Sequence, residues 1–545
     1  MRSSNARAAG AAVGLISMAM TLAVAAATPG RGPLPAVEVS DDGRFLQTED
    51  GEPFFWLADT AWRLFRLDSD ELDVYFVNRA EKGFTVIQGP LLLTDKPNYA
   101  GEINFDPEQP NEAWFTHIDT IIAKAEAHGL YIAPCLAHGT AESVLTLDTA
   151  YSFGHYVGTR YKDAGNIAAF LVATEFNYPE PNVELWAKIA EGLLDGLGDD
   201  APLLTIHPRW FGGYGGQTSS AHLHDADWLG FNMIQSAQYG DCTNDPDHPR
   251  YLGVHNWLLV EHDYALSPDK PVLDAEPTFE MVDPNHPSCD APQPRWDEFG
   301  VRRRAYWSVF SGGFGVSYGA NGVFQFHQVD DPVYDWAPLD YWDVAMDYPG
   351  AEQMGYLREL IESRPFFARI PGQDLLLDDP DGDVPTHVHA TRDADGQYAF
   401  IYIPQADRDV RIDMTLLMGM SAIAWWYHPV IGTAELIGIF SATDSQSHGF
   451  IVFTTPPVGE DWVLVLDDAA QGFPPPGSLW SGQASADLDG DGVVGTSDLL
   501  LLIAAWGPCP DPPLACPADL IADGQVDAGD LCVLLAQWGA GAAGA

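Results

Sequence analysis

Positively charged residues are scarce in this 545-residue sequence. Its 26 lysines and arginines stand against 78 aspartates and glutamates, which gives a formal net charge of −52 at pH 7. A chain this acidic is repelled by other polyanions, so nucleic acid and anionic membrane surfaces are excluded as partners. The charge instead favours solubility in a salty or calcium-rich medium.

Several motifs are also missing. No Gly-rich phosphate fingerprint follows the first predicted strand, where Asp59-Thr-Ala-Trp62 stands, so no dinucleotide cofactor is expected. No His-Glu-x-x-His zinc helix occurs, and no Gly-x-Ser-x-Gly nucleophile elbow is expected, which argues against a protease. We therefore expect no cofactor for catalysis.

Cysteine is rare as well. Six cysteines fit an oxidising compartment but are too few to build a disulfide scaffold of this size. Cys135 lies in an apolar run and is expected to be a buried thiol, while Cys242 and Cys289 are candidates to pair. Three more lie near the C-terminus, and the sequence leaves their pairing open: Cys509, Cys516 and Cys532.

The N-terminus predicts a secretory signal peptide over residues 1–27. Two arginines precede an apolar stretch of small residues from Ala8 to Ala27, which ends in a cleavage site before Thr28. No later apolar run is long enough to span a bilayer, so no membrane insertion is expected after cleavage. The mature protein is expected to be secreted, periplasmic or at the cell surface.

Residues 36–365 predict an α/β fold, the (β/α)₈ or TIM barrel. After a hairpin over residues 36–51, apolar runs alternate with amphipathic segments, which implies a parallel sheet. Eight such units over roughly 300 residues match a barrel rather than an open sheet. The predicted strands are Phe54–Ala58, Thr85–Gly89, Tyr131–Leu136, Ala169–Thr174, Leu203–His207, Leu229–Ile234, Val272–Ala275 and Gly315–Tyr318. Predicted helices include 70–82, 112–128, 183–197 and 302–310.

The pattern changes after the barrel. Residues 370–468 show short alternating strands separated by turn signals and no helical period, which predicts a small β-sandwich. Residues 472–482 are rich in Pro and Gly and are typical of a linker. They separate a tail over residues 485–540, predicted as an all-α module with calcium loops.

The tail contains two acidic loops with the spacing of calcium ligands. The first supplies oxygens at positions 1, 3, 5 and 12 and a glycine at position 6. In the second, Ile521 at position 3 cannot ligate, so that site should be weaker. The predicted Ca²⁺ ligands are Asp487, Asp489, Asp491, Val493 and Asp498 in the first loop and Asp519, Asp523 and Asp530 in the second. Each loop leads into a Leu-rich helix ending in Trp-Gly. This duplicated pattern resembles a type I dockerin, which implies either docking to a cohesin-type partner or a calcium-stabilised terminal unit.

Two acidic residues follow barrel strands. Glu276 closes Lys270-Pro-Val-Leu-Asp-Ala-Glu276, the seventh strand, and Glu175 closes Phe170-Leu-Val-Ala-Thr-Glu175, the fourth. In a barrel the carboxyl ends of the strands meet in one mouth. Cleavage of a glycosidic bond needs two carboxylates across that bond, about 5–5.5 Å apart when one of them is the nucleophile. The pair Glu175 and Glu276 is thus the candidate catalytic pair.

Further polar and aromatic residues stand at or just past predicted strand ends. Sugar sites combine hydroxyl-bonding groups with aromatic faces, and this set has both. The candidate substrate-binding residues are Asp59, Gln88, His138, His207, Trp210, Asn232, Gln235 and Tyr318. A packing role in the barrel mouth is the alternative for each, and for His207 and Trp62 it weighs equally. Asp274, two residues before Glu276, is expected to point into the barrel wall or away from the site.

Six segments carry a resemblance to a known family. They are Trp56-Leu-Ala-Asp-Thr-Ala-Trp62, Lys82-Gly-Phe-Thr-Val-Ile-Gln88, Asn111-Glu-Ala-Trp-Phe115, Phe231-Asn-Met-Ile-Gln-Ser236, Pro271-Val-Leu-Asp-Ala-Glu-Pro277 and Arg303-Arg-Ala-Tyr-Trp-Ser-Val-Phe310. Residues 37–365 resemble the apiosidase-like glycoside hydrolases. The following module, with Ala424-Trp-Trp-Tyr427 and Gly459-Glu-Asp-Trp462, resembles the collagen-binding-type domain of that family.

This resemblance implies a barrel that removes apiose-linked sugar from pectin side chains. The chain departs from the family at the end of the fourth strand, where Ala173-Thr-Glu175 replaces the usual Gly-Gly-Asp. The sequence therefore predicts a secreted glycoside hydrolase, retaining, with a poly- or oligosaccharide substrate; whether it acts in exo or endo fashion stays open. The alternative is a non-catalytic carbohydrate-binding scaffold attached through its C-terminal modules.

Overall fold

The structure is a computed structural model. It describes residues 34–174, 182–199, 201–209, 213–236, 255–283, 294–331, 337–378, 386–417, 419, 421–441, 450–478, 486, 488, 493–509, 516–520 and 525–538. The predicted signal peptide lies outside these residues, as do Cys242 and Cys289.

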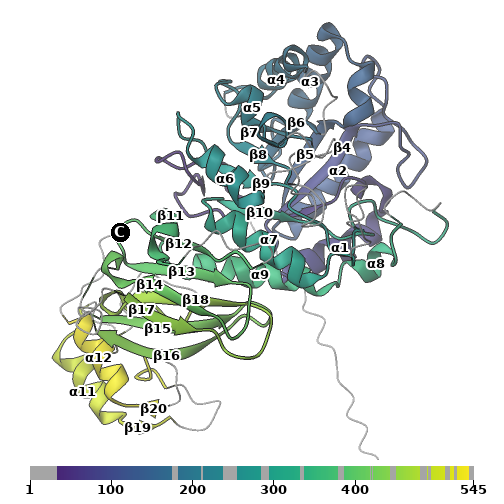
Figure 1. Ribbon diagram of the computed structural model, residues 1–545. Helices are drawn as coiled ribbons and strands as arrows, with labels where there is room; N and C mark the ends of the chain where they lie inside the picture. The colour runs from purple at the N-terminus through teal and green to yellow at the C-terminus, as the bar shows by residue number, and fades with distance from the viewer. Residues whose placement is uncertain are drawn as a thin grey trace, which may run out of the picture. The chain divides into compact units, whose positions relative to one another are not determined.

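Eight parallel strands form a nearly closed barrel (Figure 1). The strands are β3 (Trp56–Thr60), β4 (Val86–Leu93), β5 (Tyr131–Ala137), β6 (Ala169–Thr174), β7 (Leu203–His207), β8 (Asn232–Ile234), β9 (Val272–Asp274) and β10 (Gly315–Tyr318). Their order is β7-β6-β5-β4-β3-β10-β9-β8, so the first and last barrel strands pair. Between β7 and β8 the gap is bridged just before β8, where Gly230 N donates to Leu204 O at 2.8 Å and Thr205 Oγ1 to Phe231 O at 2.8 Å.

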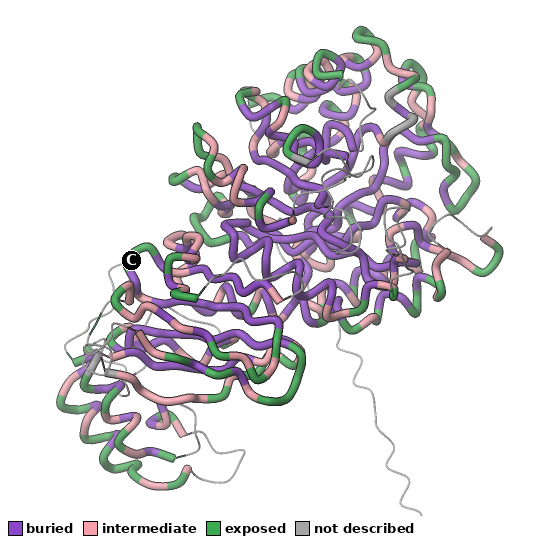
Figure 2. The backbone as a smooth tube through the Cα atoms, in the orientation of Figure 1, coloured by how far each residue is buried: buried purple, intermediate pink, exposed green. Residues whose placement is uncertain are grey.

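Figure 2 shows that the barrel strands are almost entirely buried. In a barrel of this kind helices cover the outside of the sheet and side chains from the strands fill its centre. All eight predicted strands are confirmed, and the bounds of β6, β7 and β10 match the prediction. β4 runs four residues further, because a register shift after Gln88 lets Leu91 and Leu93 keep pairing with β5. β8 begins three residues later than predicted, at Asn232.

Helices follow the strands in the order a barrel requires. Those of the barrel are α1 (Ser69–Glu81), α2 (Glu112–Ala127), α3 (Leu147–Tyr161), α4 (Val183–Leu197), α5 (Ser220–Leu223), α6 (Asn256–Tyr264), α7 (Glu298–Phe310), α8 (Trp342–Ala345) and α9 (Pro349–Glu362). Short 3₁₀ turns lie at η1 (Leu64–Arg66), η2 (Gly139–Val144) and η3 (Gly213–Gly215). Asp68 begins α1 with a complete capping box, in which its side chain and that of Glu71 each accept a backbone N–H. None of the helices in the described part of the chain has the length and apolar character needed to cross a membrane.

Glycines allow close contact between α3 and α4, the helices that come before and after β6 in the sequence. A Cβ at Gly192 of α4 would lie 2.1 Å from Tyr151 O and 2.9 Å from His155 N, both in α3. Gly154 and the other glycines of the pair face the partner backbone in the same way. The two helices therefore pack backbone against backbone, next to the strand that leads to Glu175.

Replacing Gly192 by alanine is expected to destabilise the protein by about 2–3 kcal/mol, because the helices must separate to admit the methyl group. Urea unfolding of the full chain measures this. Gly215→Ala is the matched control, since a Cβ at that position would meet nothing within 4 Å, and it should unfold like the wild type. An unchanged midpoint for Gly192→Ala would contradict the close packing.

After the barrel come two antiparallel sheets with a hydrophobic core between them, as the sequence predicted. The larger has the order β11-β12-β13-β18-β15-β16, and β14 pairs with β17 in the smaller. The strands are β11 (Arg369–Pro371), β12 (His389–Asp393), β13 (Tyr398–Ile403), β14 (Asp409–Asp413), β15 (Ser421–His428), β16 (Thr433–Ser441), β17 (Phe450–Thr454) and β18 (Trp462–Asp468). The 3₁₀ turns here are η4 (Gln373–Leu375), η5 (Met414–Leu416) and η6 (Ala469–Gln471). At the start of the chain, β1 (Val37–Val39) and β2 (Leu46–Thr48) form the predicted hairpin.

The tail is not purely α-helical. Between α11 (Thr496–Ala504) and α12 (Ala528–Ala536), the two-residue strands β19 (Gly507–Pro508) and β20 (Gln525–Val526) pair antiparallel, which corrects the prediction of an all-α module. The predicted linker over residues 472–482 also begins with residues that pack against the rest of the protein. Phe473 is buried, with the Arg364 guanidinium 4.8 Å from its ring centre.

Candidate active site

Side chains at or just past the ends of four different barrel strands form a connected group at one rim of the barrel. Trp62 follows β3, and its ring centre lies 5.3 Å from that of His207, the last residue of β7, and 6.4 Å from that of His138, which follows β5. Across from them, Glu276 Oε2 lies 3.6 Å from His207 Nε2. The structure thus brings together His138, His207 and Glu276, as the strand-end argument predicted.

Glu276 lies two residues past the end of β9, after a bend at Ala275. The preceding residue, Ala275, still donates its N–H to Ile234 O at 2.8 Å, so the chain remains tied to β8 up to this point. The side chain is only 7% exposed and its Oε2 is fully buried. A buried carboxylate beside an imidazole is suited to nucleophilic or acid–base work.

The other candidate acid, Glu175, lies outside the described residues. Its predecessor Thr174 ends β6 and is buried between the ends of the two neighbouring strands, pairing with His138 on one side and His207 on the other. β6 therefore ends at the same rim of the barrel that carries His207. Trp210 also lies outside the described residues.

The hydrogen bond of His207 defines which nitrogen carries a proton. Its Nδ1 lies 3.0 Å from Pro208 O, and a carbonyl oxygen only accepts, so Nδ1 must be the donor. In the neutral ring Nε2 then faces Glu276 with a lone pair, and in the imidazolium it forms an ion pair with that carboxylate. The imidazolium form of His207 is therefore placed to stabilise the negative charge of Glu276.

Gln88 lies inside the barrel and makes internal hydrogen bonds. Its Oε1 accepts from Ser317 Oγ at 3.1 Å, and its Nε2 donates to Ala275 O, across the barrel, at 3.2 Å. Both atoms of the amide that we predicted to bind sugar hydroxyls are thus engaged with the protein. These contacts indicate that Gln88 supports the segment leading to Glu276 and does not bind substrate.

Ser317 is also the serine of a Gly-x-Ser-x-Gly pattern. Gly315-Val-Ser-Tyr-Gly319 does match the letters Gly-x-Ser-x-Gly, contrary to the expectation that the chain lacks them. Ser317 lies within β10, however, and its hydroxyl donates to Gln88 inside the barrel. A nucleophile elbow requires an exposed serine on a strand-to-helix turn, so this segment is not one.

Asp59 and Tyr318 face the helices outside the barrel. They occupy paired positions on β3 and β10, so they lie on the same side of the sheet. Asp59 Oδ2 accepts from Tyr75 Oη at 2.6 Å and lies 3.3 Å from Arg79 Nη1, both in α1, and burial raises the pKa of this carboxyl. Tyr318 Oη donates to Glu280 at 2.7 Å. Both are structural in these contacts, which corrects the prediction that they bind substrate.

Asn232 and Gln235 lie at opposite ends of β8. Asn232 begins the strand, and its Nδ2 donates to His224 Nδ1 at 3.1 Å, so it is at the end away from the mouth, contrary to the prediction. Gln235 follows the strand on the mouth side and is buried, with its backbone N–H donating to Gln217 O at 2.9 Å. Only Gln235 of the two is placed near Glu276.

The sequence argument missed a second buried acid after β9, Glu280. Its Oε2 accepts from Tyr318 Oη at 2.7 Å and from Gly350 N at 3.0 Å. Burial raises the pKa of this carboxyl to about 7, although the Tyr318 hydrogen bond opposes the rise. A helical or strand period did not mark this residue, because it lies in the irregular segment between β9 and α7.

The raised pKa of Glu280 predicts a pH effect on stability. The folded protein binds this proton more tightly than the unfolded chain, whose pKa is near 4.5, so the free energy of unfolding falls as the pH rises from about 4.5 to 7, by on the order of 3 kcal/mol. Glu280→Gln should flatten that decline, since an amide oxygen can still accept both hydrogen bonds. Urea unfolding at pH 5 and pH 8 measures it, with exposed Glu352→Gln in α9 as the control. An equal decline in Glu280→Gln and the wild type would contradict the assignment.

In the tail, Asp498 and Asp530, the predicted ligands at position 12 of the two loops, each accept two backbone hydrogen bonds at equivalent positions. Asp498 Oδ1 accepts from Leu488 N at 2.7 Å and its Oδ2 from Gly495 N at 2.6 Å, and Asp530 makes the corresponding two bonds at 2.7 Å each. Val493 is half exposed. The remaining ligands Asp487, Asp489, Asp491 and Asp523 lie outside the described residues.

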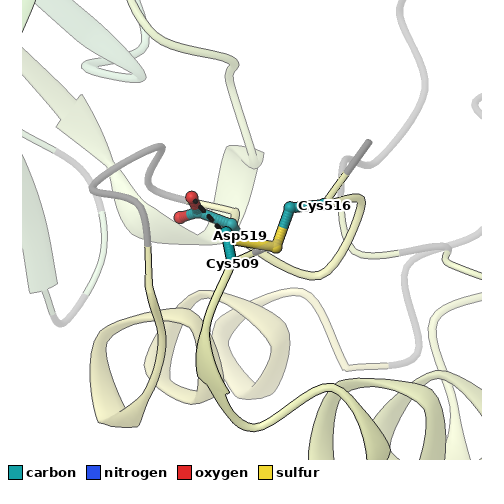
Figure 3. Close-up of side chains that lie close together, drawn as sticks. All are labelled: Cys509, Cys516 and Asp519. Carbon is teal, nitrogen blue, oxygen red and sulfur yellow. Dashed lines mark hydrogen bonds between the residues drawn. A yellow bond between two sulfur atoms is a disulfide. The ribbon is translucent and has the colours of Figure 1, made fainter. Parts of the chain in front are cut away.

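A disulfide joins Cys509 and Cys516 near the second loop (Figure 3). Asp519, the predicted first ligand of that loop, places Oδ2 3.3 Å from Cys509 Sγ. The three residues cluster as metal ligands do, but disulfide-bonded sulfur is not a thiolate and does not ligate. Cys532 is a free, exposed thiol and Cys135 a buried one, as predicted for Cys135.

Comparison with known proteins agrees with the barrel fold. A solved glycoside hydrolase shares 31% identity, covers 80% of this chain and 97% of its own, and superposes with a TM-score of 0.70. A glycoside hydrolase family 5 structure from Bacteroides vulgatus shares 30% identity over 80% and 94% of the two chains, also with a TM-score of 0.70. A third structure, at 13% identity and a TM-score of 0.57, shares the fold alone. No curated protein matches the sequence significantly. The fold and site therefore define a glycoside-hydrolase-type barrel.

Family models give the finer assignment. The model of the apiosidase-like catalytic domain matches residues 40–368, more than half of the chain. A second model, of a collagen-binding-like domain of a collagenase, matches residues 370–467. The chain belongs to the apiosidase-like family.

Proposed function

We propose that this protein is a retaining glycoside hydrolase that acts on side chains of plant or algal polysaccharides related to pectin. The observation that carries the proposal is the position of Glu276, buried at the barrel mouth 3.6 Å from His207, after the seventh barrel strand. Glu175 follows the fourth strand in the sequence. Carboxylates after these two strands supply the nucleophile and the acid–base of a retaining reaction.

In this mechanism Glu276 attacks the anomeric carbon while Glu175 protonates the leaving oxygen. The bond from sugar to leaving group breaks, a covalent bond from the sugar to Glu276 forms, and Glu175 then removes a proton from the water that releases the sugar. In its imidazolium form, His207 stabilises the Glu276 carboxylate before attack and after release. Trp62 offers an aromatic wall for the sugar ring.

Membership of the apiosidase-like family supports an apiose-linked sugar as the unit released. At the fourth strand this chain has Thr174 and Glu175 where the family pattern has glycine and aspartate, so its acid is one methylene longer. We expect the leaving group, rather than the sugar in the nucleophile's subsite, to differ from that of relatives with aspartate. Apiose specificity is therefore one arm of the test below.

Incubation of the protein without residues 1–27 with pectic side-chain oligosaccharides and plant glycosides tests the function. Chromatography of released sugars should show one sugar from the wild type and none from Glu175→Gln. Release of apiose would support the family's activity, and release of another sugar would redirect the specificity. Binding without release by the wild type would favour the non-catalytic carbohydrate-binding scaffold.

We propose further that the chain is exported and that its tail binds Ca²⁺. The equivalent hydrogen bonds of Asp498 and Asp530 support two loops of one design, and carboxylate oxygens are the donors Ca²⁺ prefers. The apolar side chains Leu500, Ile503 and Trp538 of the tail are exposed, and we propose that a cohesin-type partner covers them.

The two loops should bind Ca²⁺ unequally. Isothermal titration of the full chain is expected to show a tighter site, lost in Asp498→Ala, and a weaker one, lost in Asp530→Ala, because Ile521 supplies no ligand at position 3 of the second loop. Addition of EGTA should lower the melting temperature of the wild type more than that of Asp498→Ala. Equal effects in both proteins would contradict calcium binding at the first loop.

A further inference from the structure

A second carboxylate, Asp274, lies two residues before Glu276 and is fully buried. Its Oδ2 accepts from Ser308 Oγ of α7 at 2.7 Å and from Ser236 Oγ, just past β8, at 2.8 Å. One carboxylate oxygen therefore ties the end of β9 to the neighbouring strand and to the helix that packs outside it. Both bonds are additional to the backbone pairing of β8 with β9, which does not involve these side chains.

The hydroxyl of Ser308 is itself oriented toward Asp274. Asn256 Nδ2 of α6 donates to Ser308 Oγ at 2.8 Å and to Arg304 O at 2.7 Å. Since a serine has a single proton and its oxygen already accepts from Asn256, the proton is left for Asp274. The contact at Asp274 is thus the end of a directed chain of hydrogen bonds running from α6 through α7 to β9.

The same stretch of backbone is held from the inner side of the barrel. Gln88 Nε2 donates to Ala275 O, the carbonyl directly before Glu276, and Gln88 is fixed in turn by Ser317. The backbone is thus held at two consecutive residues, at Asp274 through its own side chain on the outer side and at Ala275 through Gln88 on the inner side. Glu276 is the next residue along the chain.

We propose that Asp274 is a positioning residue for Glu276, which holds the nucleophile's backbone so that its carboxylate meets the anomeric carbon at the required angle. The inference rests on the proposed function. A misplacement of about 1 Å at a reacting group costs about 10²-fold in rate. Asp274 itself touches no substrate in this mechanism, because its side chain lies on the outer side of the barrel, against Ser308 of α7.

Kinetics of Asp274→Ala, Asp274→Asn and Ser308→Ala on the substrate that the wild type cleaves test this. Asp274→Ala is expected to lower kcat by about 10²-fold with KM nearly unchanged. Asp274→Asn should recover most of the rate, because its amide oxygen can accept from both serines. The kcat of Ser308→Ala, which removes one donor, should fall between those of the two Asp274 variants.

Asp263 of α6 provides the matched control. It is buried and accepts from Ser220 Oγ at 2.6 Å and from Thr218 Oγ1. Asp263→Ala should lower the melting temperature without changing kcat.

The outcomes separate the inference from the function on which it rests. Wild-type turnover with a kcat of Asp274→Ala within about threefold of it would overturn the positioning role and leave the glycosidase standing. Loss of kcat in Asp274→Ala and Asp263→Ala alike would also overturn it, since the effect would then be general destabilisation. Should Asp274→Ala fail to fold, Ser308→Ala decides by the same criteria. Absence of any wild-type turnover would overturn both proposals.

Discussion

Glu276→Gln is expected to lower kcat by at least about 10³-fold on the oligosaccharide that the wild type cleaves. The amide is close in size to the carboxylate but cannot attack an anomeric carbon, so folding and substrate binding should persist. The 3.6 Å approach of His207 to Glu276 would become a contact with a neutral side chain, and KM should change little. Steady-state kinetics with a melting curve of each protein measure the effect.

Two further variants make that result specific. Glu276→Ala should regain turnover when sodium azide is added, because the small anion enters the space left by the carboxylate and attacks in its place. Glu191→Gln, an exposed acid on α4, should behave like the wild type. Near-native kcat in Glu276→Gln would remove this residue from the nucleophile's role.

The largest loss of stability is expected from Asp461→Ala. Asp461 is fully buried, and its carboxylate accepts from Arg302 Nε and Nη2 of α7, each at 2.7 Å, and from Tyr402 Oη at 2.8 Å. Without it the Arg302 guanidinium is left buried without its anion, which costs about 3–5 kcal/mol. Urea unfolding should show the loss as a lower midpoint.

An exposed pair supplies the control for this prediction. Arg392 and Asp374 make a similar contact at 2.9 Å, but Asp374 is half exposed, so Asp374→Ala should cost less than about 1 kcal/mol. The double variant Arg302→Met with Asp461→Leu should be more stable than Asp461→Ala, because no unpaired charge remains. Equal costs for Asp461→Ala and Asp374→Ala would show that burial of the pair does not matter.

The alternation of strands and helices was readable from the sequence because each barrel strand is a short apolar run bounded by turn residues. The strand ends were readable for the same reason, and they correctly placed His138, His207 and Glu276 at one mouth. The acid–base partner Glu175 follows from the same argument, and it stays a prediction because the described residues stop at Thr174.

The direction of side chains within a strand was not readable. A barrel strand is buried on both faces, so the polar–apolar alternation that marks inside and outside in an open sheet is missing. Asp59 and Tyr318 were therefore assigned to the site, although both face the helices. Asn232 was misplaced for another reason: the apolar run begins at Leu229, whereas pairing begins only at Asn232.

Long-range polar contacts also leave no local signal. Arg302 begins the predicted helix 302–310, and nothing in the neighbouring sequence indicates its bond to Asp461, 159 residues away. The pairing of β19 with β20 was missed because two residues per strand make no pattern. In each case the tertiary fold, not the local sequence, brings the two partners together.

The stereochemistry of the released sugar tests the central claim most directly. Proton NMR of the wild-type reaction, recorded before mutarotation, reports the anomeric configuration of the first product. A covalent intermediate on Glu276 requires two displacements, so the mechanism predicts retention of the substrate's configuration. A first product of inverted configuration would mean that water attacks the sugar directly, and would contradict Glu276 as the nucleophile.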